Sequence, residues 1–124
     1  MNPTQVIDRF AEFLSAGDAE AALALYEPDA AFVVEPGTIV TGHEAIGEAL
    51  RQFAALRPVL TGDIEQVVQA EDVALVTNRW TLAGTTPAGD AVHMAGRSAD
   101  VLRRDAEGNW KITIDDPWGG SDDR

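Results

Sequence analysis

The sequence predicts an α+β domain in which three helices pack on one face of a curved antiparallel sheet. Helical spacing of apolar residues is confined to the first half of the chain. From residue 63 onward, strand-like runs of roughly ten residues alternate with turn signals. The chain has 124 residues, of which 45% are hydrophobic, and this suits one domain with one core.

The first two helices are predicted in the first 28 residues. Asn2 before Pro3 is typical of a helix start, because asparagine caps free N–H groups and proline lacks only an N–H that would stay unpaired. Gly17 should end this helix. Asp18 can cap a second, shorter helix, and Pro28 should end it because proline has no backbone donor. The first helix should bury the apolar residues Val6, Ile7, Phe10, Phe13 and Leu14.

A strand and a third helix follow. The apolar run 31–34 predicts the strand, and the Pro-Gly pair at 36–37 predicts its turn. Thr41 and Glu44 have the spacing of a capping box, so the helix should begin there. Because the residue before a proline is displaced from the α region, this helix should end near Arg57.

Three successive hairpins are predicted in the second half, with turn signals at 71–72, 87–90 and 105–108. Pairing the strands back from the last two turns sets Arg97 opposite Trp80 on one side and Asp116 on the other. Because side chains alternate along a strand, one face should be an apolar floor with a small polar cluster. Its members would be Val76, Asn78, Trp80, Leu82, Arg97, Val101, Ile112, Ile114 and Asp116.

The polar cluster on this face has two interpretations. Asn78, Trp80 and Arg97 on an apolar wall have the make-up of a small-molecule cavity. Alternatively, Arg97 and Asp116 form a buried ion pair that holds the sheet. An adjacent arginine lowers the pKa of a carboxylate, so Arg97 is a better anchor for an anionic or carbonyl-bearing ligand than Asp116 is a base. Asp116 is nevertheless the candidate catalytic carboxylate.

Five segments of the chain match a known family in order: residues 25–30 (LYEPDA), 42–46 (GHEAI), 79–82 (RWTL), 96–98 (GRS) and 110–119 (WKITIDDPWG). Together they resemble the nuclear-transport-factor-2-like superfamily, and within it the SnoaL-like and ketosteroid-isomerase-homologue branch. The resemblance implies a cone-like, cystatin-like barrel with three N-terminal helices in the concave side of the sheet. It also implies a single domain over 1–118, followed by a polar tail at 119–124.

For function, the resemblance implies a small-molecule-binding protein. An isomerase-type acid–base enzyme acting on a small apolar carbonyl compound is one form of this hypothesis, and cyclase, hydrolase or lyase chemistry occurs on the same fold. The alternative is a non-catalytic binding or assembly module with a vestigial pocket. Tyr26 and Trp118 lie in family motifs and join the candidate ligand-binding residues. Ketosteroid isomerase uses an Asp base with an oxyanion hole of a tyrosine and a protonated Asp. Tyr26 is the one tyrosine here.

Several partners and cofactors are not expected. Lys and Arg total 9 against 21 Asp and Glu, and a net charge of −12 repels nucleic acids and anionic membranes. The chain has no cysteine, and His43 and His93 lie in no metal-binding spacing, so no metal or other cofactor is expected. No signal-peptide pattern is visible, which favours the cytoplasm. The resemblance implies a homodimer formed through the outer face of the sheet.

Overall fold

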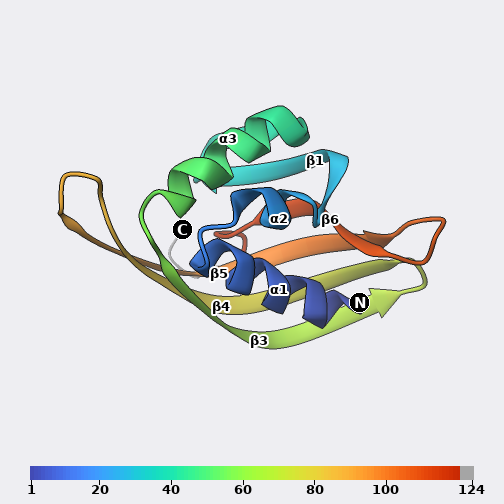
Figure 1. Cartoon of the computed structure of the whole chain (residues 1–124). Helices are drawn as coiled ribbons and strands as arrows, with labels where there is room; N and C mark the ends of the chain where they lie inside the picture. The colour runs from blue at the N-terminus through green and yellow to red at the C-terminus, as the bar shows by residue number, and fades with distance from the viewer. Residues whose placement is uncertain (121–124) are drawn as a thin grey trace.

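Three helices lie on the concave side of a curved, six-stranded sheet in the computed structural model of the chain, which describes residues 1–120 (Figure 1). In chain order the elements are α1 (Pro3–Ser15), α2 (Ala19–Leu23), β1 (Tyr26–Glu35), β2 (Thr38–Thr41), α3 (Gly42–Ala54), β3 (Val59–Ala70), β4 (Val73–Thr85), β5 (Ala91–Arg104) and β6 (Trp110–Asp116). The predicted α+β fold class is confirmed. Residues 121–124 of the predicted polar tail lie outside the described residues.

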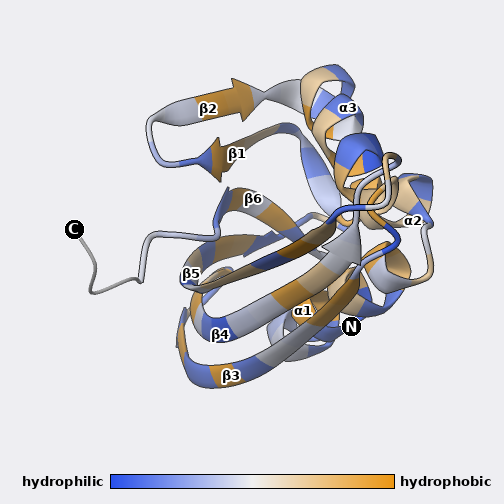
Figure 2. Cartoon of the chain, turned by 90° about the vertical axis from the view of Figure 1, so that its left-hand side faces the viewer, coloured by the Kyte–Doolittle hydropathy of each residue, from blue (hydrophilic) through white to orange (hydrophobic). Residues whose placement is uncertain are grey.

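The strand order is β2-β1-β6-β5-β4-β3. Figure 2 shows how the sheet curls from β3 around to β1 and β2, which leaves β2 and β3 as free edges, so the predicted barrel is open. The three predicted hairpins form β3 to β6, and all their pairings are antiparallel. β1 instead pairs with β6 in parallel. None of the helices within residues 1–120 is long and apolar enough to cross a membrane.

Two of the three helix caps predicted from the sequence are present in the structure. Asn2 accepts a hydrogen bond from the backbone N–H of Gln5 (2.9 Å), and Asp18 accepts one from Ala21 (3.0 Å), so both predicted caps form. The capping box predicted at the start of α3 is wrong, because the Thr41 side chain makes no cap hydrogen bond. The backbone of Thr41 belongs to β2.

Two further boundaries differ from the sequence expectation. β1 starts at Tyr26, so Pro28 lies within a strand rather than only ending a helix. The β1–β6 register is irregular between Tyr26 and Ala31, where a proline without a donor is tolerated. The third helix ends at Ala54, and Arg57 follows with a positive φ of 49°.

The last two hairpin loops are each one residue shorter than predicted, whereas the first, at 71–72, has the predicted length. The N–H of Thr86 donates to the carbonyl of Asp90 (2.8 Å), and the N–H of Asp105 donates to that of Asn109 (2.8 Å). Each loop therefore holds three residues and includes a glycine in the left-handed region, at φ 93° and 86°. Every residue of β5 consequently shifts by one position against β4, which reverses the face to which it points.

The shift decides which side chains line the concave face. On β4, alternate residues from Val76 to Leu82 are buried there, as predicted. On β5, the register places Asp100 opposite Val76 and Ser98 opposite Asn78. A register irregularity between Ile112 and Ile114 then brings Ile112 and Asp115 of β6 to the same face. Arg97, Val101, Ile114 and Asp116 belong to the opposite side, so the prediction for these four is wrong.

Candidate functional site

A cavity of about 280 Å³ lies between α1 and the concave side of the sheet. This volume is close to the lower end of the range for small-molecule sites, about 300 Å³. Its wall is mostly apolar and takes residues from α1, α3 and strands β1 and β3 to β6. Five aromatic side chains contribute to it: Phe10, Phe32, Phe53, Trp80 and Trp118.

Two buried carboxyl groups form the polar part of the wall. Asp100 of β5 and Asp115 of β6 lie directly opposite each other in the register, and both line the cavity. They are 5% and 7% exposed, respectively. Their side chains are hydrogen-bonded to each other. Asp100 also accepts a hydrogen bond from the backbone N–H of Asp116 (3.2 Å).

Tyr26 holds Asp115 from the side of the core. Its hydroxyl donates a hydrogen bond to Oδ2 of Asp115. Burial raises the pKa of Tyr26 well above its usual value, and the nearby charge of Asp115 raises it further. The phenol therefore stays protonated and acts as a donor. The edge of Phe10 meets its ring at a centroid distance of 6.0 Å, which fixes the ring in place.

The two carboxyl groups differ in proton affinity. Burial raises the pKa of Asp100 well above its usual value, and the charge of Asp115 adds to this effect. Burial also raises the pKa of Asp115, but the hydrogen bonds from Asp100 and Tyr26 work in the opposite direction. Asp100 is thus the member of the pair with the more strongly raised pKa, whereas the hydrogen bond from Tyr26 favours the charged form of Asp115.

Two further polar atoms of the wall have no hydrogen-bond partner among the described residues: Oδ1 of Asn78 and Nε1 of Trp118. Gly62 packs closely against the asparagine, since a Cβ there would lie 2.9 Å from Oδ1. Trp118 meets Trp80 edge to face at a centroid distance of 5.2 Å. The indole N–H of Trp80 is satisfied by the carbonyl of Pro117 (2.8 Å).

The structure brings together part of the predicted site. The cavity is lined by Asn78, Trp80 and Trp118. Tyr26 does not line it, but its hydroxyl is hydrogen-bonded to Asp115, which does. Their roles in ligand binding stay predictions.

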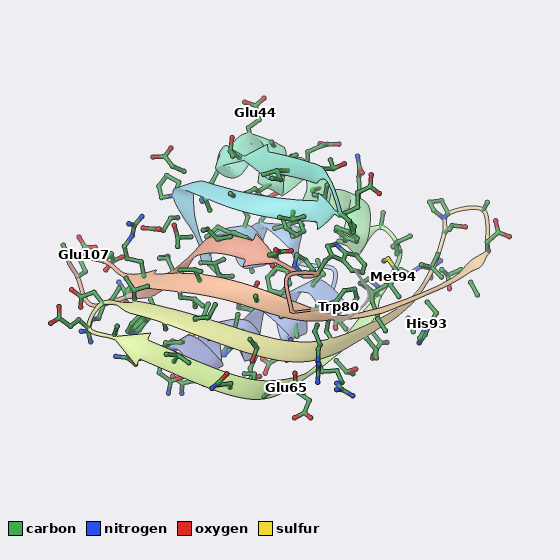
Figure 3. All side chains as sticks on the ribbon, turned by 180° about the vertical axis from the view of Figure 1, so that it is seen from behind. Glu44, Glu65, Trp80, His93, Met94 and Glu107 are labelled. Atoms are coloured by element: carbon green, nitrogen blue, oxygen red, sulfur yellow. The ribbon has the colours of Figure 1, made fainter. Side chains whose placement is uncertain are left out.

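Arg97 and Asp116 lie elsewhere. Arg97 is opposite Arg79 rather than Trp80, and its guanidinium Nε lies 3.2 Å from Oε1 of Glu65. Glu65 projects from the outer side of the sheet (Figure 3). Asp116 is opposite Ala99, and its carboxylate accepts from the backbone N–H of Trp118 (3.1 Å). The predicted facing of Arg97 and Asp116 is wrong, because the loop before β6 holds three residues instead of four and β6 has a register irregularity after Ile112.

Sequence reasoning missed Asp100 and Asp115. A signal for Asp100 was present, because Ser98, Asp100 and Leu102 alternate in phase on β5 and Leu102 is an obvious core residue. Reading Gly89 as the left-handed end of a three-residue loop would have placed this series inside. The irregularity that turns Asp115 inward has no comparable signal.

Residues 1–120 contain no group of three or more His, Cys, Asp or Glu side chains arranged to hold a metal ion. Of the two histidines, His43 is in the first turn of α3. Its Nε2 lies 2.8 Å from the carbonyl oxygen of Tyr26, so it joins the helix to β1.

Solved structures with the same fold differ widely in sequence. A ketosteroid isomerase-like protein from Erwinia carotovora atroseptica has a TM-score of 0.77 and 23% identity, over 90% of this chain and 88% of that chain. A candidate scytalone dehydratase from Novosphingobium aromaticivorans has a TM-score of 0.80 and 16% identity, over 90% and 77%. A candidate calcium/calmodulin dependent protein kinase II association domain from Xanthomonas campestris has a TM-score of 0.75 and 20% identity, over 91% and 81%.

At these identities the likeness concerns the fold alone. A search of curated proteins gives no match. The model of the SnoaL-like domain matches residues 7–113, which is most of the chain. The chain therefore belongs to the SnoaL-like domain family of the nuclear-transport-factor-2-like superfamily.

Proposed function

We propose that the protein binds a small, mostly apolar carbonyl compound in the cavity and isomerises it by acid–base chemistry without a cofactor. The observation that carries this proposal is the pair of buried carboxyl groups, Asp100 and Asp115, which lie opposite each other in the wall of an apolar cavity. Burying such a pair without a cation is costly for folding, and perturbed carboxyl groups of this kind are enriched at functional sites.

The geometry supports a proton transfer in which the two carboxyl groups exchange roles. Asp100 donates its proton to the carbonyl oxygen of the ligand. Asp115 loses the hydrogen bond from Asp100 and becomes a stronger base, so it removes a proton from the carbon beside the carbonyl. The electrons of the broken C–H bond form the C=C bond of an enol. Return of the enol proton to Asp100, and of the other proton from Asp115 to a different carbon, restores the pair.

Tyr26 would act as a positioning residue for this step. Its hydrogen bond to Oδ2 of Asp115 fixes one carboxylate oxygen and leaves the other for proton transfer. This arrangement uses a tyrosine and two aspartates, the residue types named for ketosteroid isomerase, but here the tyrosine contacts the base.

The test is isomerisation of 3-cyclohexenone to the conjugated 2-cyclohexenone, which is followed by ultraviolet absorbance. We expect the wild type to catalyse this reaction. The rate of isomerisation should fall by roughly 10²–10⁴-fold in Asp115→Asn and in Asp100→Asn. The matched control is Asp63→Asn, an exposed carboxylate of β3, which should keep full activity. Binding of the ketone without turnover would reject the catalytic part and favour a non-catalytic binding module.

We also propose that the chain forms a homodimer through the outer face of the sheet. A continuous row of apolar side chains crosses four strands there, since each residue is opposite the next: Val68, Leu75, Val101 and Ile114. Val68, Leu75 and Ile114 are 50%, 41% and 44% exposed, which is unusual for neighbouring apolar residues on one face. The association-domain description of the Xanthomonas campestris neighbour supports an assembly role for this fold.

Sedimentation measures the dimer directly. We expect the wild type to sediment as a dimer and Leu75→Asp to sediment as a monomer with an unchanged circular dichroism spectrum. Asp placed at the exposed Ile39 of β2, outside the row, is the matched control and should leave the dimer intact. A monomeric wild type at high concentration would reject this proposal.

A further inference from the structure

Two residues of the cavity wall each carry a polar atom that the described part of the protein leaves unpaired. Oδ1 of Asn78 accepts no hydrogen bond and Nε1 of Trp118 donates none within residues 1–120, although both atoms are buried. Buried polar atoms are nearly always paired in folded proteins, so two unpaired atoms in one cavity wall point to a ligand that pairs with them.

Both side chains are fixed in place before a ligand arrives. Asn78 is 8% exposed and is held against Gly62, where no Cβ would fit without displacing it. Trp118 is held on two sides, by the edge-to-face contact of its ring with Trp80 and by the hydrogen bond from its backbone N–H to the carboxylate of Asp116. Groups fixed in this way select a ligand by the position of its polar atoms.

The charge of the lining argues against an anionic ligand. No Lys, Arg or His belongs to the cavity wall within the described part of the chain. Its ionisable members are all acidic: Asp8 and Glu12 on the exposed side of α1, and the pair Asp100 and Asp115. The only guanidinium predicted to anchor an anion, that of Arg97, lies outside this cavity.

A cation is not favoured either. Hydrogen bonds from Tyr26 and Asp100 already stabilise the charged form of Asp115 within the protein, so this group does not depend on a cationic ligand. Asp8 and Glu12 are exposed to solvent, which screens them. The free N–H of Trp118 requires an acceptor, and an ammonium group has none.

We infer that the ligand is an uncharged ring compound that donates a hydrogen bond to Asn78 and accepts one from Trp118, such as a hydroxyketone. This inference rests on the proposed function and narrows its substrate class. The ring of the ligand packs against the aromatic side chains of the wall. Its hydroxyl group pairs with Oδ1 of Asn78, and its carbonyl group pairs with Nε1 of Trp118. The cavity volume suits one or two rings.

Matched single-ring probes test this inference by NMR titration at neutral pH. The panel is 3- and 4-hydroxyacetophenone, acetophenone, phenol, 4-hydroxybenzoate and 4-hydroxybenzylamine. We expect one hydroxyacetophenone to bind more tightly than acetophenone and phenol by about fivefold for each added hydrogen bond. The benzoate should bind weakest. Tightest binding of the benzoate or of the amine would overturn the inference.

Two variants assign the contacts. Asn78→Leu keeps the side-chain volume and should remove the advantage of the hydroxyl group alone, whereas Trp118→Phe should remove the advantage of the carbonyl group alone. Gly62→Ala is a second way to disturb Asn78, because the new Cβ displaces Oδ1, and it serves if Asn78→Leu does not fold.

The outcomes separate this inference from the proposed function. If all probes shift cavity resonances with equal affinity, the donor and acceptor preference is overturned and the proposed function stands. If no probe binds and 3-cyclohexenone is not isomerised, the proposed function fails and the inference fails with it. Equal losses for every probe in both variants would also overturn the assignment of the two contacts.

Discussion

The two faces of β4 and β5 differ sharply, although both consist of alternate residues of the same strands. The concave face carries closely packed apolar residues and a buried polar group built on Asn78, Asp100 and Asp115. The convex face carries exposed apolar residues such as Leu75 and solvent-facing ion pairs such as that of Arg97. A change of one residue in loop length would exchange these environments, so the loops decide which acids become buried.

The largest expected difference between the faces is in packing. Leu102 is fully buried on the concave side and Leu75 is 41% exposed on the convex side. Leu102→Ala should lower the free energy of unfolding by about 2–5 kcal/mol, and Leu75→Ala by less than about 1 kcal/mol. Urea denaturation of dilute protein measures both. Equal losses in dilute protein would contradict the contrast, and a Leu75→Ala loss that grows with concentration would indicate that a second copy covers this side.

A smaller effect on stability is expected for Tyr26, which donates a hydrogen bond to Asp115 of the buried carboxyl pair. Tyr26→Phe keeps the ring but removes the donor to Asp115. We expect a loss of about 1–3 kcal/mol in the free energy of unfolding, because a buried carboxylate then lacks one hydrogen bond. Thr81→Val, on the exposed side of β4, removes a hydroxyl contact with Thr61 and serves as the control. A Tyr26→Phe protein as stable as the wild type would remove Tyr26 from the site.

The raised pKa values of Asp100 and Asp115 predict how stability depends on pH. An acid whose pKa is raised by folding binds its proton more tightly in the folded state, so its contribution is present at low pH and is lost as pH rises through the folded pKa. At pH values above the usual pKa range of Asp, the free energy of unfolding of the wild type should therefore fall by up to about 1.4 kcal/mol per pH unit for each such group.

Asp100→Asn should flatten this part of the stability curve, because it removes one proton-binding site from the pair. The measurement is the free energy of unfolding at several pH values, compared with Asp63→Asn, which should keep the wild-type slope. Equal slopes in all three proteins would mean that the two carboxyl groups do not share a proton.

The smallest effect is expected for the ion pair on the convex face. Glu65 and Arg97 are each about one third exposed, at 33% and 32%. Glu65→Gln should lower the free energy of unfolding by only about 0.2–1 kcal/mol, and added salt should reduce the difference. A loss of about 3–5 kcal/mol would instead indicate a buried, structural ion pair, as one interpretation of the sequence had it for Arg97.

Local signals were sufficient for most of the element order of this protein, but they did not predict the short strand β2 (Thr38–Thr41). The caps Asn2 and Asp18, the turn at 36–37 and the glycines of the hairpins each act over a few residues, so they are readable in a single sequence. The inward positions on β4, including Asn78 and Trp80, were also correct, because β4 lies upstream of both misjudged loops.

The two buried carboxyl groups, Asp100 and Asp115, could not be predicted from local signals in the same way. Asp115 is buried because β6 has an irregularity after Ile112, and Asp100 because the loop before β5 closes one residue early. The expectation for Asp116 failed at the same points. In each case, the loop or the irregularity could sit one residue earlier or later, and the local backbone preferences of the residues hardly distinguish the two positions.

The sequence by itself determined the fold class, the helix starts, the order of the hairpins and an acidic chain without cysteine. Only the tertiary structure decided which carboxyl groups share the cavity with Asn78 and Trp118. The physical reason is that the strand period is two residues, so a shift of one position hardly alters the local backbone energy but moves each side chain from solvent to core.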